Sequence, residues 1–99
     1  MDITQSAQVI ESKVTALRQL AVQLDQTLKN QAAKDYLVGR ATDLLDDVEA
    51  ALRHGKSKDS THPWMWFYMA DFSLVEAERR LKHAQDMVAR FGADLEAIG

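Results

Sequence analysis

The chain has no cysteine, a single proline and only four glycines among its 99 residues. Without cysteine, the protein can have no disulfide framework, no thiolate zinc site and no cysteine nucleophile. Because proline and glycine are the residues that most often interrupt regular structure, their scarcity leaves long stretches free to form helices. These absences favour a fold made of a few long elements and suit a reducing, intracellular environment.

The sequence also lacks a long apolar run and an excess of basic charge. No stretch approaches the roughly 20 apolar residues of a membrane-spanning helix, and the N-terminus MDITQSAQVIESK lacks the pattern of a signal peptide. We therefore predict a cytoplasmic protein with no membrane span. The formal charge is -3, the isoelectric point is near 5.5, and the basic residues are scattered among acids. No nucleic-acid partner is expected from this distribution.

Motifs for catalysis and cofactor binding are missing as well. The sequence contains no glycine-rich phosphate loop, nucleophile elbow or zincin motif. No histidine stands three residues after a glutamate, as the di-metal sites of helical bundles require. One group of acidic residues is interpreted as a solvated helix face and not as a metal site: Asp43, Asp46, Asp47 and Glu49. Three separated histidines are interpreted as surface residues: His54, His62 and His83. We predict no catalytic residues, no metal site and no cofactor.

Residues 16–25 are similar to the start of the small all-helical chorismate mutases, which are about as long as this chain and also begin with a long helix. That family holds a dicarboxylate substrate with several inward arginines and a lysine. After the first predicted helix, this sequence supplies only Lys34 and Arg40. We assign no family, and a small helical enzyme is the third of the functions considered.

Three apolar seams with alternating four- and three-residue steps predict three helices, at about residues 3–29, 33–54 and 63–98. The first seam contains Ile3, Ala7, Ile10, Val14, Leu17, Ala21, Leu24 and Leu28. The second contains Leu37, Ala41, Leu44, Val48 and Ala51, widened by Val38, Leu45 and Leu52. The third contains Phe67, Ala70, Leu74, Ala77, Leu81, Ala84, Val88 and Phe91, with Leu95 and Ile98 in register beyond.

Four residues set the predicted boundaries. Asn30, followed by residues 31–33, is the expected break between the first two helices. Gly55 is expected to end the second helix in a left-handed conformation, and Pro63 fits the first turn of the third. The third helix is expected to run on through Gly92. Short connections then give an all-α, up-down-up, antiparallel three-helix bundle in one domain, residues 1–99. Its alanine-rich core is thin, which favours a homodimer.

Five of the seven aromatic residues lie in HPWMWFYMADF, residues 62–72. On a helical wheel, Phe67, Ala70 and Leu74 face the seam of the bundle. Four apolar residues point the opposite way: Met65, Tyr68, Phe72 and Val75. Burying these four side chains contributes about 6–10 kcal/mol before the costs of association. A three-helix bundle covers one face of each helix, so we predict that they form the interface of a homodimer or another protein complex.

Three alternative roles for this segment stay open. The aromatic side chains could close the end of the bundle within one chain, under the loop at residues 55–62. They could contact a membrane surface. Alternatively, a pocket for a small apolar ligand could lie under two tryptophans, with these residues around it: Trp64, Trp66, Phe67, Ala7, Ala51 and Ala70. The predicted function is a non-enzymatic, self-associating helical interaction module, with apolar-ligand binding as the alternative.

Overall fold

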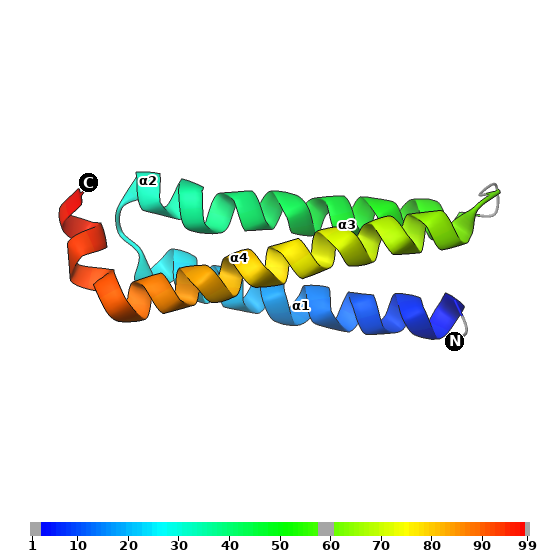
Figure 1. Cartoon of the computed structure of the whole chain (residues 1–99), viewed down its shortest axis with the longest axis horizontal. Coiled ribbons are helices and arrows are strands. Elements are labelled where there is room, and N and C mark those ends of the chain that lie inside the picture. Colours follow the sequence, from blue (N-terminus) through cyan, green and yellow to red (C-terminus); the bar gives the residue numbers. More distant parts are fainter. Residues whose placement is uncertain (1–2, 58–60, 99) are drawn as a thin grey trace.

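Three long helical stretches lie side by side in the computed structural model, which describes residues 3–57 and 61–98, and side-chain surroundings for residues 7–57 and 61–92 (Figure 1). The first is α1 (Ile3–Thr27). The second is a continuous helical run of α2 (Gln31–Lys34), a π-helical turn η1 (Asp35–Gly39) and α3 (Arg40–Lys56), and the third is α4 (Pro63–Ile98). The part of the chain that the structure describes contains no strand. The predicted all-α three-helix bundle is confirmed.

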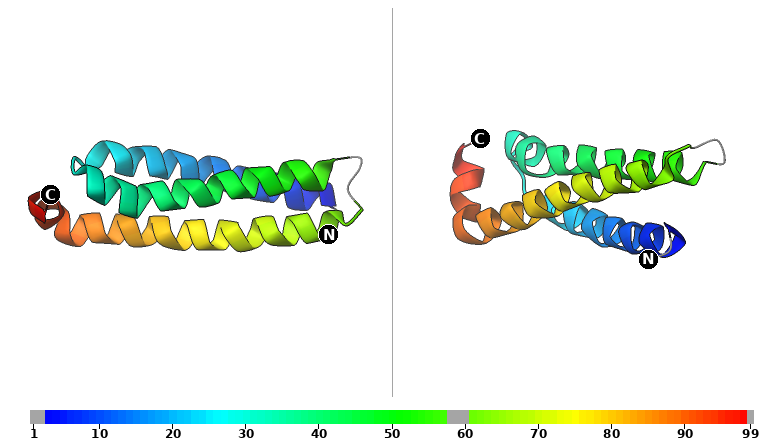
Figure 2. Two further views of the ribbon diagram at one scale, coloured as in Figure 1. Left: turned by 90° about the horizontal axis from the view of Figure 1, so that it is seen from above. Right: turned by 45° about the vertical axis from the view of Figure 1, so that its right-hand side comes forward.

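The bundle is elongated, with extents of 50 × 20 × 17 Å. α1 and α4 run in the same direction, and the run from α2 to α3 is antiparallel to both (Figure 1). α4 begins beside the end of α3 and crosses diagonally toward the end of α1, as Figure 1 and the right view of Figure 2 show. The chain therefore presents one side of α4 to the other two helices and leaves its opposite side without a helical neighbour.

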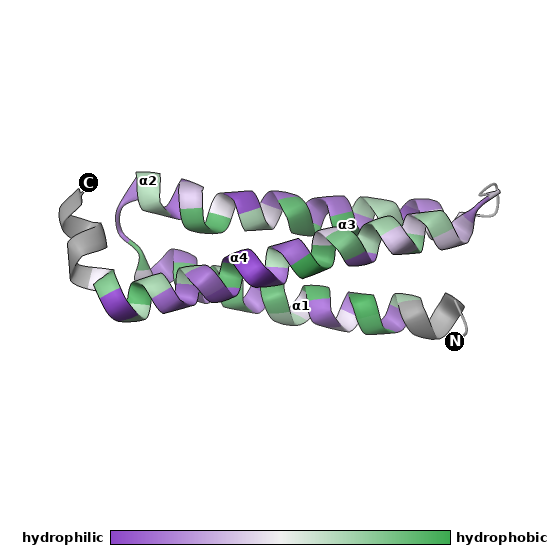
Figure 3. Ribbon diagram, viewed as in Figure 1, coloured by the Kyte–Doolittle hydropathy of each residue, from purple (hydrophilic) through white to green (hydrophobic). Residues whose placement is uncertain are grey.

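The core is formed by the predicted seams. Every seam residue from Ala7 to Leu24 in α1 is buried, as is Leu28 directly after it, and in α4 every one from Phe67 to Ala84 is buried. No polar or charged side chain with described surroundings is buried. Each long helix consequently alternates hydrophobic with hydrophilic residues along its length (Figure 3). This alternation is the pattern of an amphipathic helix that packs through one stripe.

The seam of the second helical run follows the prediction except at one position. Leu44, which the heptad pattern placed in the seam, is only partly buried, whereas Leu45, predicted beside it, is fully buried. The other predicted positions are all buried: Leu37, Val38, Ala41, Val48, Ala51 and Leu52.

Asn30 separates the first two helices as predicted, but it does so as an N-cap. Its backbone is extended, with φ -75° and ψ 122°, and its side-chain oxygen accepts a hydrogen bond of 2.9 Å from the backbone N–H of Ala33. Such a cap satisfies one of the free N–H groups of the first turn. The second helix therefore begins at Gln31, two residues before the predicted start, and residues 31–33 are helical instead of forming part of the break.

The predicted left-handed conformation of Gly55 is wrong. No described residue has a positive φ, and the helix continues through Gly55 to Lys56, followed by extended Ser57. Gly55 is buried against the start of α4. A Cβ atom there would lie 3.2 Å from the Cβ of Trp66 and 3.2 Å from the ring of Phe67. Glycine is needed here because the two helices approach closely, and not because the backbone turns.

α4 begins at Pro63 and ends at Ile98, close to the predicted bounds, but it is not straight. Phe91 has φ -130° and ψ 20°, which is not helical, and the residues after it turn away from the bundle axis (Figure 1). The helix therefore runs past Gly92 as expected, but with a kink at Phe91. Phe91 is 38% exposed and does not extend the buried seam. The predicted seam residues Ile3, Leu95 and Ile98 lie outside the residues whose side chains are described.

Candidate functional site

Six of the ten large hydrophobic residues that are exposed among the described residues lie on the side of α4 that faces away from the bundle. Six side chains in its first half form this outer face: Trp64, Met65, Tyr68, Met69, Phe72 and Val75. Tyr68, Phe72 and Trp64 are 69%, 71% and 66% exposed, and no described residue of the chain covers them. Their exposure agrees with the helical wheel; their role as an interface stays a prediction.

Trp64 and Met69 belong to the outer face although sequence reasoning did not place them there. Met69 lies one turn after Met65, and Trp64 lies one turn before Tyr68, so each is beside a predicted position on the same side of the helix. The i+4 spacing was a readable signal. The outer face is therefore wider than the four predicted residues and flanks them on both sides.

In the second half of α4 the corresponding surface is charged. Glu76 accepts hydrogen bonds from Arg79, the shortest 2.7 Å, and lies 3.2 Å from Nε of Arg80. Lys82 donates to Glu78 at 2.8 Å. The Arg79 hydrogen bond lowers the pKa of Glu76, and the Lys82 hydrogen bond lowers the pKa of Glu78. These pairs keep the second half solvated, so the apolar surface ends at Val75.

The inner side of the same segment explains why it can hold so many aromatic residues. Phe67 is buried, and Trp66 is partly buried against α3. The Trp66 ring stacks on the ring of His54, with 4.7 Å between centroids and 24° between planes. Because Gly55 has no side chain, both aromatics can pack directly on the last turn of α3. The first turns of α4 are thus fixed from within, which orients the outer face.

The six residues of the predicted pocket lie in different surroundings. Ala51 and Ala70 are buried in the core, Trp64 is exposed, and Trp66 packs on His54. Two members do meet at a recess of about 440 Å³ between the start of α1 and the start of α4. It is lined by Ala7, Gln8, Glu11, Gly55, Lys56, Pro63 and Phe67. The tryptophans do not roof this recess; ligand binding there stays a prediction.

A second recess, of about 280 Å³, lies between η1 and the middle of α4. It is lined by Tyr36, Leu37, Arg79, Arg80 and His83. Two arginines and a histidine suggest an anion site. Both arginines, however, are already paired with the carboxylate of Glu76, which neutralises part of their charge. The arrangement is that of a structural charge cluster on a helix surface.

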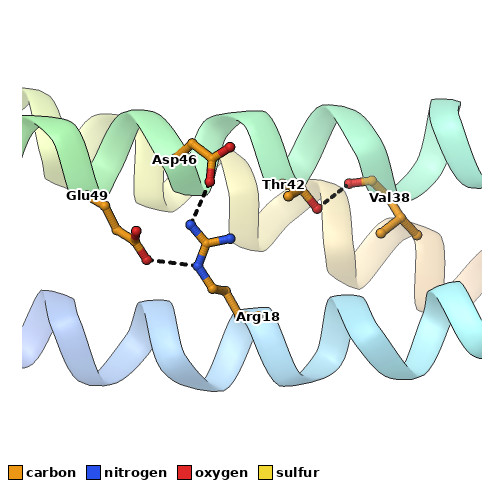
Figure 4. A network of polar contacts seen from close by, with 5 residues as sticks. All are labelled: Arg18, Val38, Thr42, Asp46 and Glu49. Carbon is orange, nitrogen blue, oxygen red and sulfur yellow. Dashed lines mark hydrogen bonds and ion pairs between the residues drawn. The ribbon is translucent and has the colours of Figure 1, made fainter.

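The acidic group on α3 has a structural partner that sequence reasoning missed. Arg18 reaches across from α1, and its Nη2 lies 2.7 Å from Asp46 while its Nε lies 2.8 Å from Glu49 (Figure 4). The hydrogen bond to Glu49, followed by that to Asp46, raises the pKa of Arg18. The sequence could not predict this contact from local spacing. Arg18 lies 28 residues from Asp46 and 31 residues from Glu49 along the chain.

Neither a metal site nor a membrane span is found among the described residues. Among the described residues, no three histidine, cysteine or acidic side chains are grouped so that they could hold a metal ion. None of the described helices combines the length and hydrophobicity needed to cross a bilayer. Comparisons with protein families, with curated proteins and with solved structures give no match. The outer face of α4 is therefore the candidate functional site on its own geometry.

Proposed function

We propose that this protein is a non-enzymatic helical interaction module that forms a homodimer through the outer face of α4. The proposal is carried by one observation, the continuous set of large apolar side chains left exposed on one side of the helix. A monomer rarely exposes a contiguous apolar patch of several hundred Å² unless that patch binds something. The exposed valines elsewhere, Val9 and Val22, stand apart on α1 and are ordinary surface residues.

The size of the outer face suits a small dimer. Trp64, Tyr68 and Phe72 are each about two-thirds exposed, and an aromatic side chain buries about 150–250 Å², so the three offer roughly 400 Å² per copy. Two copies together supply roughly 800 Å² from these rings, and Met65, Met69 and Val75 add to that area. Specific interfaces bury about 1,200 Å² or more in total, so the face is adequate at the lower end of that range.

The core of the single chain supplies a second reason for association. Many of its seam positions are alanines, including Ala70, Ala77 and Ala84, each fully buried. Alanine allows close helix approach but removes little apolar area from water, whereas leucine or phenylalanine removes far more. A bundle of this size is only modestly stable alone. Burying the outer face against a second copy adds stability through mass action.

The test is the mass of the protein in solution. Gel filtration with light scattering at several hundred micromolar should give about twice the chain mass of 11.1 kDa. The double variant Tyr68→Ser/Phe72→Ser should give the monomer mass with an unchanged circular dichroism spectrum. If these rings instead stabilise the fold within one chain, the variant unfolds. A monomeric wild type, or a variant that stays dimeric, would overturn the proposal.

A matched control uses the second half of the same helix. His83→Ser/Ala89→Ser introduces two serines at exposed positions of α4 that lie beyond the outer face. It has the same number of helix-weakening substitutions and should remain a dimer. If it dissociates together with the Tyr68/Phe72 variant, the loss reflects a weaker helix and not a lost interface.

Binding of a small apolar ligand is the second candidate, favoured by the recess beside Ala7 and Phe67. Its volume of about 440 Å³ falls within the range typical of ligand pockets, about 300–1,000 Å³. Calorimetric titration with indole and with octanol should give saturable heats that Gln8→Trp, at the recess, abolishes. Gln19→Trp, on an exposed part of α1 away from the recess, is the control. Flat titrations with both probes would sink this candidate.

A further inference from the structure

The four central residues of the outer face have the spacing of a coiled-coil seam. Met65, Tyr68, Phe72 and Val75 follow one another at steps of three, four and three residues, which are successive a and d positions of two heptads. All four are exposed, and the residues between them that face the bundle, such as Ala70, are buried. The helix thus carries two seams on opposite sides, one for the fold and one that is unpartnered.

We propose that a second copy of the chain docks on this seam in an antiparallel orientation, with the two-fold axis beside residue 70. This rests on the proposed homodimer and specifies its geometry. In this register, Met65 of each copy lies level with Val75 of the other, and Tyr68 lies level with Phe72. Each residue at an a position therefore packs against a residue at a d position. The aromatic residues Tyr68 and Phe72 face each other, as do the apolar residues Met65 and Val75, and each pair occurs twice in the interface. Such self-complementarity is what a two-fold interface requires.

The charges beyond the seam select this orientation over the parallel one. The same a and d spacing continues to Arg79, Lys82 and Asp86. In a parallel pair in register, each of these charged residues would face the same residue of the other chain at the centre of the seam. Like charges in that position are destabilising. In the antiparallel register, Arg79 lies level with residue 61 of the partner, before that helix begins at Pro63. The three charged side chains then extend past the contact into solvent.

One unfavourable contact remains in the antiparallel arrangement. Asp71 lies beside the seam, in the g position, and would come near Asp71 of the other chain across the two-fold axis. Asp71 is exposed, so this repulsion is screened by water and salt. A parallel pair places Asp71 near Glu76 of the other copy on both sides, in addition to the repulsions within the seam. The antiparallel register therefore has the smaller electrostatic cost.

Cysteine pairing tests the register, because the chain has no cysteine of its own. Met65→Cys and Val75→Cys variants, one of them tagged to change its mass, are oxidised separately and as a mixture. We expect a disulfide-linked dimer of one tagged and one untagged chain in the mixture, and no linked dimer from either variant alone. Two copies of position 65 would be about 15 Å apart along the axis, at 1.5 Å per residue, too far for a disulfide. A linked dimer from Met65→Cys alone, or none from a dimeric mixture, overturns the register.

A spin label at His83, outside the outer face, keeps the test decisive if the seam cysteines weaken the dimer. In the antiparallel register two labels are about 40 Å apart along the axis, whereas a parallel pair holds them within about one to two helix diameters, roughly 10–20 Å. A short distance in a dimer of the correct mass overturns the orientation but leaves the homodimer intact. A monomeric wild type instead overturns the homodimer and the register together, so the two failures are distinguishable.

Discussion

The two halves of α4 pack similar residues into the bundle but present different surfaces to water. Residues 63–75 bury Phe67, Ala70 and Leu74, and residues 76–90 bury Ala77, Leu81 and Ala84. On the other side, the first half exposes aromatic and methionine side chains, while the second half exposes ion pairs. Because the surface changes while the core does not, we expect that folding does not require the outer apolar residues. This difference is why we place function in the first half.

Leucine-to-alanine substitutions on the inner side should have the largest effect and should be similar in both halves. Leu74→Ala and Leu81→Ala each remove a side chain with 2% exposure or less, and each should lower the free energy of unfolding by about 2–5 kcal/mol. Phe72→Ala, measured at a concentration where the chain is monomeric, should change it by less than about 0.5 kcal/mol. Urea titrations give all three values. If Phe72→Ala costs as much as Leu74→Ala, the outer face belongs to the fold.

Two glycines, Gly55 in α3 and Gly92 within α4, provide a smaller contrast. Gly55 packs against Trp66 and Phe67, and a Cβ there meets the backbone-anchored Cβ of Trp66 at 3.2 Å. Gly55→Ala should therefore destabilise by about 1 kcal/mol or more, because overpacking exceeds the gain in helix propensity. Gly92→Ala meets nothing within 4 Å and should stabilise by about 0.5–1 kcal/mol. Thermal unfolding of both variants checks the signs. If both variants shift the melting temperature in the same direction, the packing at the start of α4 is not tight.

The sequence was sufficient for the features that depend on local periodicity. The steps of three and four residues identified the buried faces of α1 and α4, and the residues opposite Leu74 were correctly expected to be exposed. Gly55 was misread because glycine is used both for left-handed caps and for close helix contacts, and only the packing partner distinguishes the two uses. Local pattern carries no information about that partner.

The remaining differences have the same physical origin. In α3 the heptad spacing placed Leu44 in the seam and Leu45 beside it, whereas Leu45 is fully buried and Leu44 only partly buried. Phe91 fits the apolar register of α4, yet its backbone is bent there, beside Gly92. Of the candidate site, the sequence supplied the position of the outer face but not its width, because Trp64 and Met69 were not placed on it.

Arg18 should contribute modestly to the fold, and its effect should depend on salt. It joins α1 to Asp46 and Glu49 on α3, but all three side chains are at least a third exposed. Arg18→Met, which retains much of the apolar stem, should cost about 0.5–1 kcal/mol at low ionic strength and less in 1 M NaCl. Denaturation at both salt concentrations checks this. Leu74→Ala, which changes no charge, should show no comparable dependence, and an Arg18 effect that salt leaves unchanged would contradict an electrostatic origin.

The smallest expected effect is the pH dependence of the charged second half of α4. Glu76 and Glu78 have pKa values lowered below their ordinary value of 4.5 by hydrogen bonds from Arg79 and Lys82. A carboxyl whose pKa is lower in the folded state stabilises the fold above its ordinary pKa, and that contribution is lost as the pH falls through the folded value. Stability should therefore decline between about pH 5 and pH 3. Both pairs are on the surface, so the decline attributable to them is slight.

Isolating that decline requires the monomeric Tyr68→Ser/Phe72→Ser background, because dissociation of a dimer would add its own pH dependence. In this background, Glu76→Gln/Glu78→Gln removes both titrating groups, and the difference in unfolding free energy between the two chains should shrink from pH 7 to pH 3. The outer face of the first half contains no carboxyl group. A difference that stays constant with pH would mean that the ion pairs add nothing to the fold, and that the two halves of α4 differ only in the apolar surface of the first.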